Sequence, residues 1–303
     1  MASEILVTGV TGFVGATLAP MLVHEDYFVR GLSRSVRPPR GAVGRTFVYD
    51  AETYALPTEA VDGAKGVVHL AGEPVSGRWT RSKKRAIERS RTLGTRAIVD
   101  AIAKAKEPPS VLVCASAIGY YGSRGDEELH EASGPGDDFL AHVCREWEEE
   151  AMRAEELGVR VVRMRLSLVL GADGGALGAM LPLFKMGLGG KIGDGGQYWP
   201  WIHVEDAARM IVCAIEDPSW TGAYNCATPT PVRQSEFATT LARVLSRPAF
   251  LPAPRLALET VLGGFATELL ASRRVVPKRA VEAGFAFTYP DLYDALRAAT
   301  GRD

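Results

Sequence analysis

The sequence predicts an α/β protein in which a doubly wound parallel sheet is followed by a smaller C-terminal lobe. Up to Gly171, short and continuously apolar segments alternate with segments that carry apolar residues at helical spacing. A glycine-rich turn joins the first of these apolar segments to the first helical one. Beyond Gly171 the chain becomes rich in glycine and proline. Strands that are apolar throughout are typical of a parallel sheet covered by helices on both faces.

The individual elements follow from this alternation. The expected strands cover residues 5–7, 27–32, 46–49, 66–70, 110–115 and part of 159–170. The expected helices cover residues 13–23, 80–105 and 138–157. In the glycine-rich segments 171–181 and 187–197 we expect the backbone to bend or to approach a ligand closely. Ligands of doubly wound sheets bind beyond the carboxyl ends of the strands, so the site is expected at that edge.

The composition excludes several classes of protein. With 47% hydrophobic and 23% charged residues, the chain resembles an ordinary globular protein, and its net charge of −1 creates no field that favours nucleic acid or anionic membranes. No CxxC pair occurs, which indicates reduced thiols and no zinc site. The four cysteines are Cys114, Cys144, Cys213 and Cys226. Neither a signal peptide nor a run of eighteen apolar residues is evident, so we expect a cytoplasmic protein without a membrane span.

The glycine-rich turn TGVTGFVG, residues 8–15, predicts a dinucleotide site. Gly9 permits the tight turn, Gly12 lets the backbone approach a diphosphate, and Gly15 lets the helix pack closely on the strand. Free N–H groups at the start of the helix then face the phosphates. The alternative is a tight strand-to-helix turn without a ligand. Thr11, Phe13 and Val14 complete the predicted binding turn.

These motifs together resemble a known family. The G-x-x-G-x-x-G spacing, HLAG (69–72), WIHVEDAA (201–208) and GAYNCAT (222–228) resemble the extended, epimerase/dehydratase-like branch of the short-chain dehydrogenase/reductase superfamily. The segments GEPVSGRWTRSKKRAIERSRTLGTR, SAIGYYG, FLAHVCREWE and VVPKRAVEAGFAFTYPDLYDAL are similar to its atypical members, which include bacterial cell-division-inhibitor homologues with a C-terminal domain of unknown function. The resemblance covers essentially the whole chain.

The resemblance implies a Rossmann-like fold and divides the chain into two parts. Residues 1–171 are expected to form the dinucleotide-binding domain, with segments around 201–228 returning to it. Residues 172–303 are expected to form mainly the substrate lobe, including a C-terminal module at about 250–300.

The end of the second strand favours NADP over NAD. A carboxylate at this place accepts hydrogen bonds from the ribose hydroxyls of NAD, but here the strand continues into Ser33-Arg34-Ser35. Arg34 offers a planar set of donors to a 2′-phosphate, and Ser33 adds a hydroxyl. The alternative is a solvated basic loop.

Other cofactor contacts are implied by the resemblance. Asp50 corresponds to an adenine-contacting aspartate, and Arg91 stands where related proteins carry asparagine, three residues before Gly94-Thr95. The remaining expected cofactor-binding residues are Leu70, Ala71, Gly72, Glu73, Ala115 and Ser116.

The superfamily's acid/base residues are missing from their expected places. The Tyr-x-x-x-Lys pair becomes Phe139 with Val143 or Leu140 with Cys144, depending on register, and Ala117 stands at the position of the usual serine. The candidates for relocated chemistry are Ser116, Tyr120 and Tyr121. Weaker candidates are His142, Glu146 and His203. The alternatives are packed aromatic rings for the tyrosines, a solvated helix face for His142 and Glu146, and support of the second lobe for His203.

Two functions are compatible with this pattern. The first is an NADP-dependent oxidoreductase or sugar-nucleotide epimerase-type enzyme of unknown substrate, which binds a small molecule in the cleft between the lobes. Residues 188–196 and the WPW motif at 199–201 would form a wall of that cleft, although packing explains the tryptophans equally well. The second is a catalytically inactive, NADP-sensing regulator or scaffold.

Overall fold

A computed structural model describes residues 3–33, 42–50 and 52–302. Its centre is a seven-stranded sheet in the order β11-β7-β5-β4-β1-β2-β3. Every pairing within this sheet is parallel. The strands are β1 (Glu4–Thr8), β2 (Phe28–Ser33), β3 (Arg45–Val48), β4 (Gly66–His69), β5 (Val111–Ala117), β7 (Arg160–Leu166) and β11 (Gly222–Cys226).

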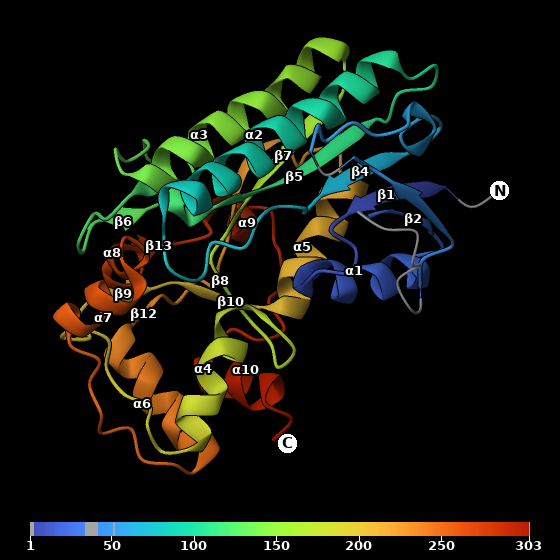
Figure 1. Cartoon of the computed structure of the whole chain (residues 1–303). Coiled ribbons are helices and arrows are strands. Elements are labelled where there is room, and N and C mark those ends of the chain that lie inside the picture. The colour runs from blue at the N-terminus through green and yellow to red at the C-terminus, as the bar shows by residue number, and fades with distance from the viewer. Residues whose placement is uncertain (1–2, 34–41, 51, 303) are drawn as a thin grey trace.

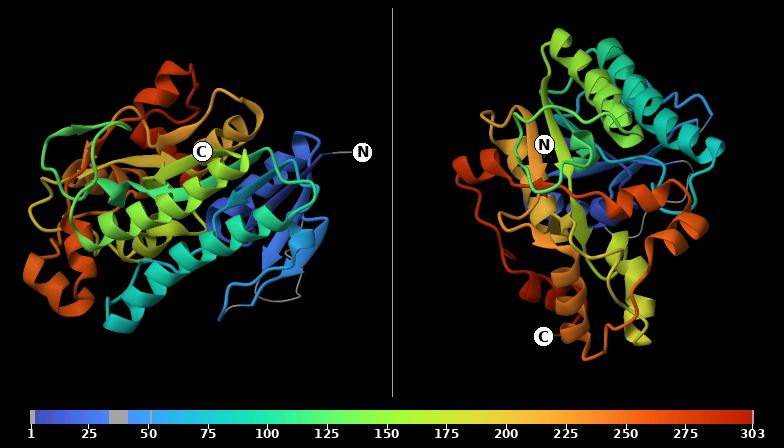
Figure 2. Two further views of the ribbon diagram at one scale, coloured as in Figure 1. Left: turned by 90° about the horizontal axis from the view of Figure 1, so that it is seen from above. Right: turned by 90° about the vertical axis from the view of Figure 1, so that its left-hand side faces the viewer.

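Two pairs of helices cover the two faces of the sheet, as the apolar strands predict (Figure 1). On one face α1 (Phe13–His24) packs against α5 (Val204–Glu216), and on the other α2 (Arg81–Lys104) packs against α3 (Phe139–Met152). Figure 2 shows α2 and α3 side by side along the sheet. Successive residues of β4 alternate between the layers, because Val67 packs under α2 and Val68 packs under α5.

A second lobe lies at the carboxyl edge of the sheet (Figure 1). Its helices are α4 (Gly175–Lys185), α6 (Gln234–Leu245), α7 (Arg255–Leu262), α8 (Phe265–Leu270) and α10 (Leu292–Ala299). Its own apolar core includes Leu181, Trp199, Trp201 and Phe237. A further helix, α9 (Lys278–Glu282), packs beside β11.

Short two-stranded pairings and 3-10 turns complete the described structure. The paired strands are β8 (Leu168–Leu170) with β10 (Trp201–His203), β9 (Tyr198–Trp199) with β12 (Val232–Arg233), and β6 (Glu128–Leu129) with β13 (Arg274–Val275). The 3-10 turns are η1 (Thr58–Ala60), η2 (Ile118–Tyr121) and η3 (Arg153–Leu157). The β6–β13 pair ties the segment after β5 to the C-terminal part of the chain.

The structure departs from the expected elements in the glycine-rich region. Residues 175–181, which we expected to bend, form the start of α4. Gly171 and Gly174, just before α4, lie against the ring of Phe13. A Cβ on Gly171 would lie 2.6 Å from that ring, and a Cβ on Gly174 would lie 2.9 Å from it. The glycines therefore admit an aromatic side chain of α1. The predicted helix 138–157 also divides into α3 and η3.

Candidate functional site

A cavity of about 700 Å³ opens at the carboxyl ends of β1, β2 and β4, where the fold predicts a ligand. Eight of the sixteen residues predicted to bind a cofactor line it. These are Gly9, Thr11, Gly12, Ser33, Leu70, Ala71, Gly72 and Glu73. The loop after β1 and the loop after β4 thus face one another across a shared space.

The glycine turn is built so that side chains cannot enter it. Gly9 has a φ of +69°, which favours glycine, and a Cβ there would lie 3.0 Å from the backbone nitrogen of Ala71. A Cβ on Gly15 would overlap the carbonyl oxygen of Gly9 and lie 2.8 Å from the Cα of Val10. The first turn of α1 therefore packs directly on the β1 loop, as the spacing predicts.

The start of α1 leaves donors free for an anion. Gly12 is the N-cap and supplies no side-chain hydrogen bond, and no acidic residue lies in the first turn. The amides of Phe13, Val14 and Gly15 precede the first intrahelical bond, from Ala16 to Gly12. The Phe13 ring lies against residues 171–175 and Val14 packs on the core, so these residues offer backbone amides to a ligand.

Aromatic and aliphatic side chains also line the cavity. Tyr49, Tyr54, Leu56 and Ile98 lie here. The Asp50 carboxylate, predicted to contact adenine, accepts hydrogen bonds from the backbone of residues 52 and 53 at 2.7 and 3.0 Å. These bonds lower the pKa of Asp50. Arg34 lies outside the described residues.

Arg91 braces the loop that follows β4. Its Nη1 donates to the carbonyl oxygen of Glu73 at 3.0 Å, and its guanidinium lies 5.1 Å from the ring centre of Trp147. A Cβ on Gly72 would lie 3.5 Å from the Arg91 guanidinium carbon. Burial lowers the pKa of Arg91. Lys83 also holds Glu73, at 2.7 Å.

Two of the predicted catalytic residues belong to a buried polar network. The Ser116 hydroxyl donates to Glu148 at 2.7 Å, and Glu148 also accepts from Arg163 and Arg165. The Tyr121 hydroxyl donates to Asn225 at 2.6 Å and accepts from Arg165 at 2.9 Å. Burial raises the pKa of Tyr121 to about 12 in spite of Arg165. Neither hydroxyl is free to contact a ligand in this arrangement.

The third candidate, Tyr120, differs from its neighbour. It is half-buried, the Arg165 guanidinium lies 3.5 Å from its ring centre, and its hydroxyl makes no hydrogen bond to any part of the chain that the structure describes. Ala115 lies next to Ser116 in β5 and is buried.

The sequence left open whether Phe139 and Val143 or Leu140 and Cys144 occupy the positions of the missing Tyr-x-x-x-Lys pair. The orientation of α3 favours the second of these alternatives. A Cβ on Gly119, beyond the end of β5, would lie 3.1 Å from the Leu140 Cβ and 3.7 Å from the Cys144 sulfur. Phe139 and Val143 lie in an apolar cluster with Ile87 of α2, and the side chain of Leu140 also reaches this cluster. Leu140 and Cys144 therefore face the end of β5. Burial raises the pKa of the Cys144 thiol to about 12, so it is neutral at physiological pH.

The weaker candidates have structural partners. His142 Nε2 lies 3.0 Å from the Glu146 carboxylate on the exposed surface of α3. His203 is the N-cap of α5, where its Nδ1 accepts from the amide of Glu205, and its ring lies 4.0 Å from that of Tyr289. Burial lowers the pKa of His203.

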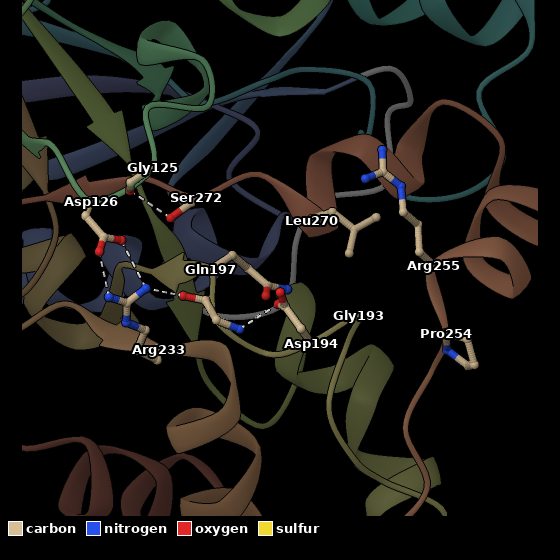
Figure 3. Close-up of a pocket in the computed structure, with 11 residues that line it drawn as sticks. Gly125, Asp126, Gly193, Asp194, Gln197, Arg233, Pro254, Arg255, Leu270 and Ser272 are labelled. Atoms are coloured by element: carbon tan, nitrogen blue, oxygen red, sulfur yellow. Dashed lines mark hydrogen bonds and ion pairs between the residues drawn. The ribbon is translucent and has the colours of Figure 1, made fainter.

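A second cavity of about 520 Å³ lies between the loop after η2 and the other lobe (Figure 3). The loop after η2 contributes Asp126, and the glycine-rich loop contributes Asp194 and Gln197. Arg233 enters from β12 and is held by Asp126 at 2.9 Å. Part of the predicted wall 188–196 thus lines a cavity. Trp199 and Trp201, by contrast, are buried in the core of the second lobe, which supports the packing alternative.

Sequence reasoning missed the residues that organise the network. Glu148 and Arg165 are each 3% exposed, and neither was given a role, although Glu148 ends the FLAHVCREWE segment. It also missed His69, which is buried on the wall of the first cavity and bonds to Thr8 at 2.7 Å. A signal for Glu148 was present, because it follows Leu140 and Cys144 at intervals of four residues and so shares their helix face.

Comparisons with known proteins agree with this geometry. The model of the NAD dependent epimerase/dehydratase family matches residues 5–227, and a domain of unknown function matches residues 253–299. The chain is 42% identical to the chloroplastic epimerase family protein SDR39U1 homolog of Arabidopsis thaliana, over 96% of this chain and 85% of that protein. It is 39% identical to the epimerase family protein YfhF of Bacillus subtilis, over 97% and 96%.

A solved structure extends the likeness to three dimensions. The crystal structure of human epimerase family protein SDR39U1 (isoform 2) with NADPH superposes with a TM-score of 0.89 at 33% identity, covering 99% of this chain and all of that one. The parallel sheet, the glycine turn and the cavity define a protein of the Rossmann-like, dinucleotide-binding class. Within that class, the chain belongs to the NAD-dependent epimerase/dehydratase family.

Two further features of the described residues bear on function. No group of three or more His, Cys, Asp or Glu side chains among them is arranged to hold a metal ion. None of the helices within the described ranges has the length and apolar character that crossing a membrane requires.

Proposed function

We propose that this chain binds NADPH in the cavity at the carboxyl edge of the sheet and acts as an oxidoreductase or epimerase-type enzyme on a small molecule. The observation that carries the proposal is the glycine turn with three uncommitted amides at the start of α1, beside a cavity large enough for a dinucleotide. The human relative crystallised with NADPH supports the choice of coenzyme. So does the absence of a carboxylate from the sequence at Ser33-Arg34.

The chain's own residues divide the work of binding. The amides of residues 13–15 hold the diphosphate, and the small residues of the β4 loop leave room for it. Arg34 and Ser33 receive the 2′-phosphate, and Tyr49 and Tyr54 flank the adenine. Bound NADPH supplies a hydride. The substrate lies between the lobes, with the cavity around Gln197 and Arg233 as its candidate pocket.

Proton transfer in this proposal does not use the usual phenol and ammonium. Leu140 and Cys144 occupy the positions that face the end of β5, and neither side chain is an acid or base at physiological pH. Of the three candidate residues, Tyr120 keeps a hydroxyl that no described residue engages. Tyr120 is therefore the proposed proton-transfer group.

The replacement of the acid/base pair by Leu140 and Cys144 favours a second candidate function. A cavity that retains its glycine turn beside an apolar replacement of the acid/base pair fits an NADPH-responsive regulator or scaffold. Two measurements separate the alternatives. Calorimetry of NADPH and NADH binding tests the coenzyme, and NADPH consumption with a panel of carbonyl compounds and nucleotide sugars tests the reaction. Turnover that Tyr120→Phe abolishes supports the enzyme, whereas binding without turnover on any substrate favours the regulator.

A further inference from the structure

His69 ends β4 and contributes to the wall of the dinucleotide cavity. Its side chain is 3% exposed, and its two ring nitrogens have different surroundings. Nδ1 lies 2.7 Å from the hydroxyl oxygen of Thr8. Nε2 is buried and has no hydrogen-bond partner among the described residues. A buried polar nitrogen without a partner costs free energy, so a partner from outside the chain is expected.

The hydrogen bonds of Thr8 determine which nitrogen of His69 carries the proton. The Thr8 hydroxyl oxygen accepts from the amides of Leu70 and Ala71, each at 3.1 Å. The Leu70 amide lies closer to this oxygen than to the Thr8 carbonyl oxygen, at 3.3 Å. With both lone pairs in use, the hydroxyl has only its proton left to share. His69 Nδ1 is the acceptor, and the ring proton is therefore on Nε2.

The ring is also neutral. Burial, and then the nearby charge of Arg91, lower the pKa of His69 to about 4. A neutral imidazole carries one N–H group, so Nε2 is a single, fixed donor at physiological pH. Thr8 thus sets the direction in which His69 donates.

Gly94 leaves space in front of this donor. A Cβ at Gly94 would lie 3.9 Å from His69 Nε2 and 3.7 Å from the ring of Tyr54. All three residues line the same cavity as Tyr49, Leu56 and Ile98. Because Gly94 carries no side chain, a space about the size of a methyl group remains between Gly94, Tyr54 and His69.

We propose that His69 is a cofactor-positioning residue, whose Nε2–H donates a hydrogen bond to an acceptor on the adenosine half of the bound dinucleotide. The inference rests on the proposed function. Thr8 holds the imidazole, and the same hydroxyl holds the Leu70 and Ala71 amides, so the turn after β4 and the adenosine donor are fixed by one side chain.

Two amide variants test the roles of the two ring nitrogens of His69 separately. In His69→Asn the amide oxygen can still accept from Thr8, but no atom reaches the position of Nε2. In His69→Gln the terminal amide nitrogen can occupy that position. We expect His69→Asn to weaken the binding of NADPH and of 2′,5′-ADP by the same factor, about 3- to 10-fold, and His69→Gln to bind within about 2-fold of the wild type. Binding of reduced nicotinamide mononucleotide, which lacks the adenosine half, should not change.

The tautomer is measured independently. Long-range ¹H–¹⁵N spectra of the imidazole at neutral pH should show the proton on Nε2 in the free and the NADPH-bound protein. A proton on Nδ1, or equal affinities of the wild type and His69→Asn, overturns the inference and leaves the proposed function intact. Equal losses in the asparagine and glutamine variants also overturn it, since they would reflect ring packing alone. Failure of the wild-type chain to bind either nucleotide overturns the proposed function, and the inference with it.

Discussion

The cavity beside the glycine turn and the region at the end of β5 lie on the same edge of one sheet, but different parts of the chain form them. The first is defined by backbone: uncommitted amides, a left-handed glycine and positions where a Cβ does not fit. The second is defined by side chains, and these are committed to one another through Glu148, Arg165 and Tyr121. Leu140 and Cys144 complete it with neutral groups.

The difference shows that a member of this family can retain the glycine turn of the dinucleotide site without the usual acid/base side chains. Backbone donors do not depend on residue identity, so a dinucleotide site survives wherever the glycines remain. Proton transfer depends on particular side chains, and a few substitutions remove it. Here Tyr121 bonds to Asn225, and Asn225 bonds to the backbone of Val276, so these two polar side chains connect the end of β5 to the C-terminal part of the chain.

The largest effect should come from breaking the network. Glu148 is 3% exposed and accepts from Ser116, Arg163 and Arg165, so Glu148→Ala leaves two guanidinium groups without their carboxylate. We expect the free energy of unfolding to fall by about 3–5 kcal/mol in urea titrations. Glu149→Ala, on the exposed surface of the same helix, is the matched control and should change it by less than about 0.5 kcal/mol. Similar losses in both variants would contradict a structural role for Glu148.

Lowering the pH should destabilise the folded chain through protonation of His69, which lies on the wall of the first cavity. Its pKa is about 4 in the folded chain and 6.5 in the reference state, so the unfolded chain binds the proton more readily between those values. Stability should therefore be complete above pH 6.5 and fall by about 3 kcal/mol as the pH drops to 4. Urea titrations across this window should show a steeper pH dependence for the wild type than for His69→Asn. Parallel curves would contradict the assignment.

A methyl group in the turn tests the backbone site directly. The Cβ of Gly15→Ala would meet the backbone of Gly9 and Val10, so the turn must open and displace the α1 amides. We expect NADPH affinity, measured by calorimetry, to fall by about 10- to 100-fold. Gly178→Ala in α4 is the control, since its Cβ would lie 3.8 Å from its only neighbour, the carbonyl oxygen of Ala172. Unchanged affinity in Gly15→Ala would remove the main support for the cavity.

The smallest expected effect concerns the choice of coenzyme. Arg34→Ala removes the proposed donors to the 2′-phosphate and should reduce the preference for NADPH over NADH by about 10-fold, because charge-assisted bonds to phosphate are lost. Arg89→Ala, an exposed cation on α2, should leave the ratio of the two affinities unchanged. The ratio is read from paired titrations with both coenzymes. A preference that survives Arg34→Ala would place 2′-phosphate recognition elsewhere.

Much of the fold could be predicted because it is encoded by local patterns. Six of the seven strands of the main sheet correspond to apolar runs bounded by polar or glycine residues, and the glycine turn adopts the geometry that its spacing indicates. The failures are tertiary in origin. Helix α4 was missed because its glycines accommodate Phe13, which is distant in sequence. The two registers of α3 were indistinguishable without the contact between Leu140 and Gly119.

The sequence by itself determined the strands of the sheet, the glycine turn at the start of α1 and the absence of the Tyr-x-x-x-Lys pair, because each depends on residues that are adjacent or regularly spaced. Only the tertiary structure decided the fate of the remaining polar groups. Ser116 and Tyr121 look like catalytic hydroxyls in the sequence, but Glu148, Asn225 and Arg165 reach them from other elements and occupy them. A hydroxyl's chemistry depends on its hydrogen-bond partners, and those partners meet only when the chain folds.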